Sequence, residues 1–216
     1  MVRLIKMDKT EVKQSIMDAA IDLFSSKGYA AVGIREITHK AGVNSSMISY
    51  YFHGKVGILK GILEKYFDDY NSLFDIFADY SKSPEQCLRE FVRKMVFYLI
   101  ENRGLAMVAN NMVSINDAVL EDWKLQQMMV SVNKMKVLIK RFGLDDEDIF
   151  VVGTIGPALT SIILNKFQRL PVIQEKWKYE LNGTVFERFA EVVASLFLDG
   201  IHGIAATLNK NPSLDS

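Results

Sequence analysis

The stretch GIREITHKAGVNSSMISYYF, residues 33–52, predicts two short helices joined by a tight turn. The first helix has one apolar face at helical spacing, formed by Ile34, Ile37 and Ala41. Gly42 suits the end of this helix, because glycine adopts a positive φ without strain. Asn44 suits the start of the second helix, because its side chain can cap free backbone N–H groups. The spacing therefore predicts a helix-turn-helix.

The second helix of this motif has two different sides. Ile48 and Phe52, four residues apart, form its apolar side. The other side carries small, polar or flat side chains, namely Ser45, Ser46, Met47, Ser49 and Tyr50. A helix-turn-helix places such a helix in the major groove, with its N-terminal residues against base edges. We therefore expect double-stranded DNA as a partner.

The flanking sequence supplies the third apolar face that two short helices need to bury enough surface. A helix is expected over residues 11–27 and ends at Gly28. Its apolar stripe consists of Ile16, Ala19, Ala20, Leu23 and Phe24. Another amphipathic helix begins after His53-Gly54-Lys55.

Residues 11–63 resemble the N-terminal domain of the TetR (tetracycline-repressor-like) family of transcriptional regulators. The matching pieces are AAIDLFSSKGYAAVGIREIT (19–38), AGV (41–43), ISYYFHGK (48–55) and IL (58–59). Gly33 departs from the pattern, since the family usually has Ser or Thr there, and glycine caps a helix slightly less well. The resemblance implies a sequence-specific DNA-binding regulator, which we expect to be a repressor released by a small molecule. It also implies a homodimer on a palindromic operator.

The resemblance assigns roles to individual residues of the motif. Arg35 is expected to contact a guanine edge, and Lys55 a phosphate. The groove side of the second helix is expected to present Ser45, Ser46, Met47 and Ser49, with Met47 against a thymine methyl group. Tyr50 and Tyr51 are expected to bond phosphates. Because this helix carries no Lys or Arg, DNA shape is expected to contribute to recognition.

The whole chain is predicted to be all-α. An N-terminal three-helix helix-turn-helix domain is expected over 8–65, and a helical ligand-binding and dimerisation domain over 66–210. Further helices are expected near 55–80, 84–102, 105–115, 118–142, 146–167 and 184–208, with a loop over 170–183 that contains Pro171 and Gly183.

Two late helices are apolar on more than one side and must cover a second surface. In the resembled family the last two helices of each subunit form a four-helix dimer interface. The residues expected there are Phe150, Ile155, Leu159, Ile162, Phe189, Val193 and Phe197. The alternative, that these are simply central core helices, stays open.

A ligand pocket is expected in the region that holds six of the ten methionines, between residues 95 and 135. Methionine and aromatic side chains can line an adaptable apolar pocket, although such a stripe is more often core. The expected lining is Phe97, Met107, Asn111, Met112, Trp123, Met129 and Asn133. The ligand is expected to be apolar or amphipathic.

The charge distribution fits DNA contact at one end of the chain. The 216 residues carry no net charge, but residues 1–66 hold ten Lys and Arg against six Asp and Glu. The single cysteine, Cys87, indicates a reducing compartment, so a cytoplasmic protein is expected. The uncharged run 149–164 is too short to span a bilayer, and no membrane partner is expected.

The sequence does not favour an enzyme. It lacks the spacings of a zinc site, a nucleophile elbow and a phosphate-binding loop, so neither a cofactor nor a metal is expected. The stronger rival function is a helical ligand- or protein-binding dimer whose DNA-binding head is vestigial.

Overall fold

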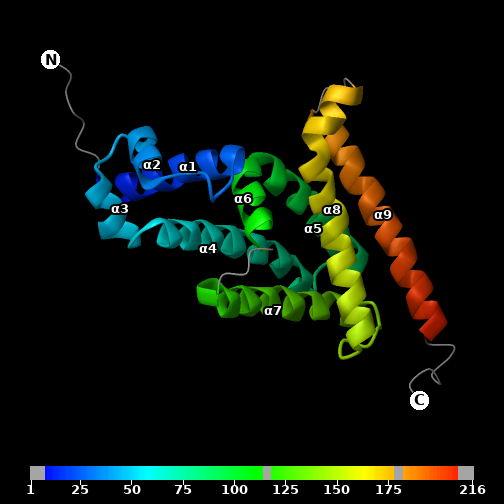
Figure 1. The fold of residues 1–216 in the computed structure, drawn as a ribbon. Helices are drawn as coiled ribbons and strands as arrows, with labels where there is room; N and C mark the ends of the chain where they lie inside the picture. The colour runs from blue at the N-terminus through cyan, green and yellow to red at the C-terminus, as the bar shows by residue number, and fades with distance from the viewer. Residues whose placement is uncertain (1–7, 114–117, 178–181, 209–216) are drawn as a thin grey trace. The chain divides into compact units, whose positions relative to one another are not determined.

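The computed structural model describes residues 8–113, 118–177 and 182–208, and all regular structure within these ranges is helical (Figure 1). The predicted all-α fold is confirmed. The elements are α1 (Lys9–Lys27), α2 (Ile34–Ala41), α3 (Ser45–Phe52), α4 (Lys55–Leu73), the 3₁₀ helix η1 (Phe74–Ala78), α5 (Pro84–Glu101), α6 (Arg103–Val113), α7 (Ala118–Arg141), α8 (Ile149–Trp177) and α9 (Gly183–Leu208).

Two predicted boundaries were wrong. The helix expected over 55–80 ends at Leu73, and the tighter η1 follows, which turns Phe74 and Phe77 into the core with their ring centroids 5.8 Å apart. The loop expected over 170–183 is shorter, because α8 continues through Pro171 to Trp177. A proline removes one hydrogen bond from a helix, but α8 stays helical on both sides of Pro171.

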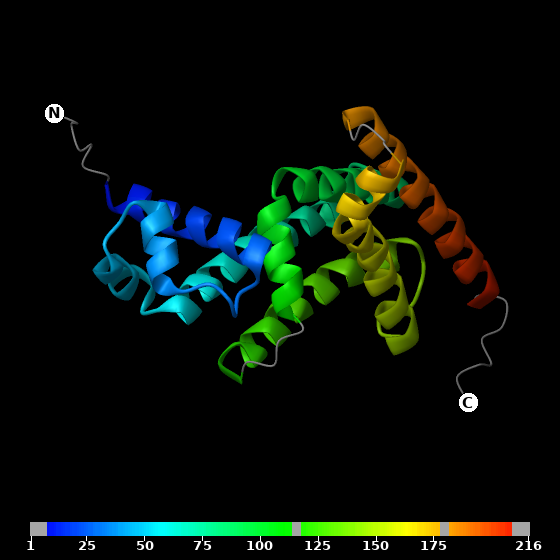
Figure 2. The same ribbon diagram turned by 45° about the horizontal axis from the view of Figure 1, so that its top comes forward.

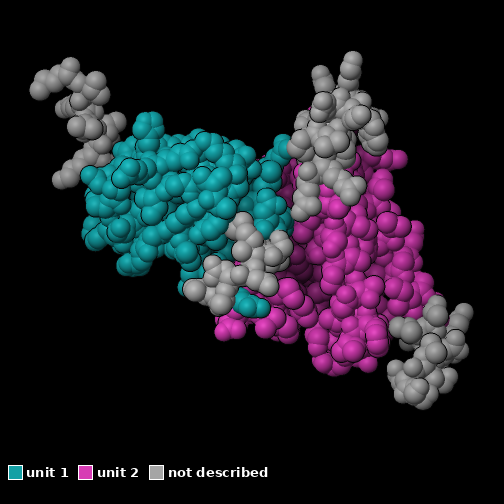
Figure 3. All heavy atoms as spheres, viewed as in Figure 1, with its two compact units in different colours: residues 1–68, 102–121 teal, residues 69–101, 122–216 magenta. Residues whose placement is uncertain are grey.

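The chain forms two compact units (Figure 3). Unit 1 consists of residues 1–68 and 102–121, and unit 2 of residues 69–101 and 122–216. The expected division at residue 65 stays a prediction.

Unit 1 is built on α1, which begins with a capping box that the sequence analysis missed. The Asp8 carboxylate accepts hydrogen bonds from the backbone N–H of Thr10 (2.7 Å) and Glu11 (2.9 Å), and the Glu11 carboxylate accepts one from Asp8 N–H (2.8 Å). Towards its C-terminal end α1 meets α6 (Figure 2). A Cβ on Gly104 would lie 3.1 Å from Ile21 Cγ2, so the glycine allows α6 to approach α1 closely.

In unit 2, α5 packs along α9, and α8 contacts both helices. An aromatic cluster of Phe74, Phe77 and Phe91, each at most 2% exposed, lies where η1 meets α5. Arg93 donates to both carboxylate oxygens of Glu187 and so ties the exposed edges of α5 and α9 together.

Candidate nucleic-acid interface

The helix-turn-helix forms at the predicted residues. Gly42 ends α2 with φ +67°, in the left-handed region, and its neighbour Val43 donates its N–H to the Thr38 carbonyl (3.0 Å). Asn44 begins α3, and its Oδ1 accepts the N–H of Ser46 (3.0 Å). Behind the turn, Ile37 and Ile48 are 0% exposed. The two helices thus each bury an apolar side chain in unit 1.

The outer face of α3 is uncharged and accessible. Ser45, Ser46 and Ser49 are exposed, and Met47 and Tyr50 are 37% and 64% exposed. Tyr51 is half-buried and lies edge-to-face against Tyr50, with the ring centroids 4.8 Å apart. The face therefore offers hydroxyl groups, one thioether and one aromatic edge, which suits contact with base edges and phosphate oxygens.

Arg35 is a cation of α2 whose side chain has no protein partner within the described residues. Within the described residues its exposed guanidinium makes no hydrogen bond or ion pair. The other cation of the helix, Lys40, pairs with Asp22 of α1, and Glu36 of α2 pairs with Lys27. These pairs fasten α2 to α1 at both ends and leave Arg35 with an uncompensated positive charge.

Lys55 lies at the start of α4 in a setting that the sequence analysis did not anticipate. Its ammonium is 4.3 Å from the centroid of the Tyr29 ring and 5.9 Å from that of Phe24. Partial burial lowers the pKa of this lysine. A phosphate contact by Lys55 would share the ammonium with these two rings, and that contact stays a prediction.

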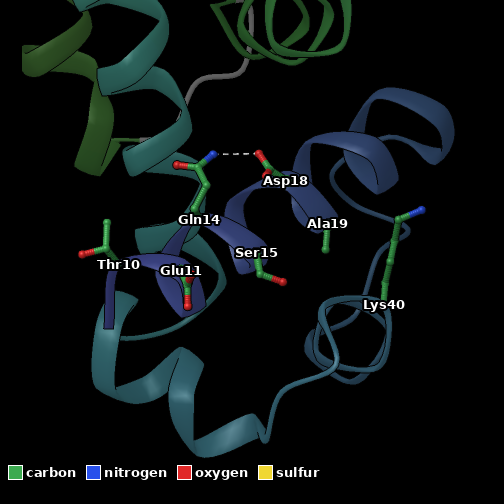
Figure 4. Close-up of a pocket in the computed structure, with 7 residues that line it drawn as sticks. All are labelled: Thr10, Glu11, Gln14, Ser15, Asp18, Ala19 and Lys40. Carbon is green, nitrogen blue, oxygen red and sulfur yellow. Dashed lines mark hydrogen bonds between the residues drawn. The ribbon is translucent and has the colours of Figure 1, made fainter. Parts of the chain in front are cut away.

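A hollow of about 700 Å³ opens on unit 1, formed by α1 and the last turn of α2 (Figure 4). It is lined by Thr10, Glu11, Gln14, Ser15, Asp18, Ala19 and Lys40. Gln14 donates its amide to Asp18 across one turn of α1 (2.8 Å). Six of these seven lining residues are polar or charged, and Ala19 is the exception. None of the seven predicted ligand-pocket residues lines it.

The predicted pocket residues fall in both units. Met107 and Asn111 lie on α6 in unit 1, whereas Phe97, Trp123, Met129 and Asn133 lie in unit 2. The side chain of Met112 is outside the described residues. The Phe97 ring lies under the guanidinium of Arg93 (5.1 Å), and Met129 is 47% exposed. The ligand pocket stays a prediction.

The predicted dimer residues divide by exposure. Phe150 and Ile162 are 78% and 38% exposed, and Phe189 and Phe197 are half-buried. Ile155, Leu159 and Val193 are at most 4% exposed and belong to the core of unit 2, which was the alternative left open for these helices. Val192 and Leu196, which are not among the predicted interface residues, are 53% and 60% exposed. Their spacing of four residues puts them on one face of α9.

The apolar character of α8 and α9 exceeds what unit 2 covers. By length and composition alone, Ile149–Phe167 and Gly183–Ala206 could each cross a membrane, with mean hydropathies of 1.5 and 1.4. Only 28% of the apolar window of each helix is buried within the chain. These helices therefore present an apolar surface that the chain itself does not cover.

Comparison with known proteins agrees with the geometry of the motif. Residues 16–62, which span most of α1, the helix-turn-helix and the start of α4, match the sequence model of the bacterial regulatory proteins of the tetR family. This tetR segment makes up less than half of the chain. The predicted resemblance is confirmed, and the rival interpretation of a vestigial head is not favoured.

The relatives extend the comparison beyond the tetR segment. A probable HTH-type transcriptional regulator of Bacillus subtilis, YttP, is 28% identical over 53% of this chain and 56% of its own length. The HTH-type transcriptional repressor NicS of Pseudomonas putida is 31% identical over 47% of each chain. The chain thus aligns with about half the length of these relatives. The solved FadR of Bacillus subtilis, in complex with stearoyl-CoA, covers 88% of this chain and 99% of its own with a TM-score of 0.68, at 18% identity. It shares the fold.

Proposed function

We propose that this protein is a sequence-specific DNA-binding transcriptional regulator and acts as a repressor. The observation that carries the proposal is the formed helix-turn-helix, with an uncharged, exposed outer face on α3 and an unpaired Arg35 on α2. The naming of the relative NicS as a transcriptional repressor supports the direction of regulation. The relatives are named as regulators, and the proposal involves no catalysed reaction.

In the proposed complex α3 lies in the major groove. Arg35 donates two hydrogen bonds to one guanine edge, and Met47 contacts a thymine methyl group. Ser45, Ser46 and Ser49 bond neighbouring base edges or phosphates. Tyr50 and Tyr51 donate their hydroxyls to phosphates, and Lys55 neutralises a phosphate. Since α3 supplies no charge, the backbone contacts and the shape of the DNA contribute a large share of the specificity.

A second copy of the chain is the proposed cover for the exposed apolar face of α8 and α9. Two copies related by a twofold axis would present two α3 helices to the half-sites of a palindromic operator. A dimer that buries these helices also accounts for their high hydropathy in a cytoplasmic protein, without a membrane partner.

The proposed effector is a small apolar or amphipathic molecule. The stearoyl-CoA complex of FadR, a protein of the same fold, supports a ligand of this class. The effector would weaken DNA binding only to the extent that it binds the released conformation more tightly than the DNA-bound one. The predicted lining residues of α5, α6 and α7 are the first positions to test for contact with it.

The deciding experiment is selection of random duplex DNA by the purified full-length protein at near-physiological salt. Enrichment of an inverted repeat is expected, because a dimer reads two identical half-sites. A folded dimeric protein that enriches nothing would contradict the proposed function.

Arg35→Ala is expected to reduce the preference for the selected duplex over random DNA by about 1–3 kcal/mol per half-site. The reason is that alanine removes both the bidentate hydrogen bonds and the charge. Arg35→Lys is the matched control, because it keeps the charge but loses the planar fork. Fluorescence anisotropy over a series of salt concentrations separates the two effects.

The two variants make the assignment of Arg35 falsifiable. Arg35→Lys should lose preference for the selected sequence while keeping the salt dependence of the wild type, since that dependence counts neutralised phosphates. If Arg35→Ala weakens binding to all sequences alike, Arg35 contacts a phosphate and not a base.

A further inference from the structure

Sulfur is distributed unevenly over the surface of the protein. The sequence has one cysteine, and Cys87 is 0% exposed, with its Sγ 3.3 Å from the Arg141 guanidinium. Met17, Met95 and Met135 are buried as well, at 7%, 0% and 2% exposure. Among the described methionines, Met47, Met128 and Met129 are the most exposed, at 37%, 54% and 47%, and Met107 is half-buried. An oxidant in solution therefore meets thioethers and not the thiol.

A thioether needs no deprotonation before it reacts, unlike a cysteine, whose thiolate is the reactive form. Hypochlorous acid transfers its oxygen atom to the sulfur. The sulfur loses two electrons, the chlorine leaves as chloride, and the proton of the acid is released. The product is methionine sulfoxide, a polar group with a strong hydrogen-bond acceptor in place of an apolar one.

Of the three exposed methionines, only Met47 lies on α3. It is in the first turn, with its N–H donated to the Asn44 carbonyl (3.0 Å), and Tyr50 follows one turn later. Its neighbours on the outer face, Ser45, Ser46 and Ser49, carry hydroxyls, so Met47 supplies the aliphatic surface of that face. Exposure and position together make this side chain both reactive and central to the DNA-reading surface.

We propose that Met47 is an oxidation site at which hypohalous acids or peroxides weaken binding to DNA. The inference rests on the proposed function. The sulfoxide oxygen is an acceptor, and it would replace a methyl thioether that faces a thymine methyl group and the acceptor-rich groove floor. The loss is reversible, because sulfoxide reductases return methionine sulfoxide to methionine.

The test compares full-length protein before and after treatment with a few equivalents of hypochlorous acid. Peptide mass spectrometry locates each added oxygen atom, and fluorescence anisotropy measures affinity for the duplex that the untreated protein selects. Met47→Leu is the first variant, since leucine keeps an apolar side chain of similar volume that cannot be oxidised. The matched control is the double variant Met128→Leu/Met129→Leu, in which Met47 is the most exposed of the described methionines that remain.

Oxidation is expected to reach Met47, Met128 and Met129 before Met17, Met95 and Met135. It should lower the affinity of the wild type and of the double variant about tenfold. Met47→Leu should keep its affinity after treatment, and a sulfoxide reductase should restore the wild type.

Two results would overturn the inference. One is oxidation of Met47 no faster than that of buried Met95. The other is an unchanged DNA affinity of the double variant after Met47 has been oxidised to the sulfoxide. This second measurement does not depend on how well Met47→Leu folds or binds. An untreated protein that selects no duplex contradicts the proposed function instead, so the two failures are distinguishable.

Discussion

Arg141→Ala is expected to lower the free energy of unfolding by about 3 kcal/mol. The guanidinium, at the end of α7, holds the turn between η1 and α5. Its Nη1 donates to the carbonyl oxygens of Phe77 (2.9 Å) and Asp79 (3.2 Å), and its Nη2 donates to that of Lys82. Alanine would leave three carbonyl groups in a partly buried turn without their charged donor.

The matched control is Arg93→Ala. Arg93 makes a bidentate ion pair with Glu187 in the same unit, but its side chain is 59% exposed, so its loss should cost less than about 1 kcal/mol. Urea unfolding of both variants at one protein concentration, followed by circular dichroism, measures the difference. Equal small losses in the two variants would show that water replaces Arg141 at the turn.

The helix-turn-helix could be predicted residue by residue because its signals are local. Gly42 and Asn44 determine the turn through their own backbone and capping preferences, and Ile37 and Ile48 mark the buried sides at helical spacing. Each of these preferences acts over a few residues of chain. The helix-turn-helix can therefore be predicted from local sequence preferences alone.

The hydrogen bonds of Arg141 and the contact of Lys55 with an aromatic ring both join residues that are distant in sequence. Arg141 meets carbonyl groups some sixty positions earlier, and Lys55 lies over Tyr29. No local pattern encodes such pairs, because only the packed helices bring them together. Similarly, the apolar residues of α8 and α9 were recognised from the sequence, whereas their division into covered and open faces depends on α5, which packs against both.

Leu196→Asp is expected to convert the proposed dimer into a folded monomer. Leu196 is 60% exposed on the same face of α9 as Val192, so a carboxylate there meets water in the single chain and would be buried in the dimer. An unpaired buried charge costs about 3 kcal/mol or more, which corresponds to more than about a hundredfold in the dimer Kd. Light scattering measures the mass, and circular dichroism verifies that the helices persist.

Leu196 is a better residue than Phe197 for this test of the interface. Phe197 is half-buried, so a charge there would also damage the core of unit 2. Leu125→Asp is the matched control, since Leu125 is 56% exposed in the same unit but lies on α7 and not on α8 or α9. It should leave both the mass and the DNA affinity unchanged.

Loss of the dimer in Leu196→Asp should weaken operator binding as well, because one half-site alone supplies only part of the contacts. A dimer that persists in Leu196→Asp and dissociates in Leu125→Asp would place the interface on α7.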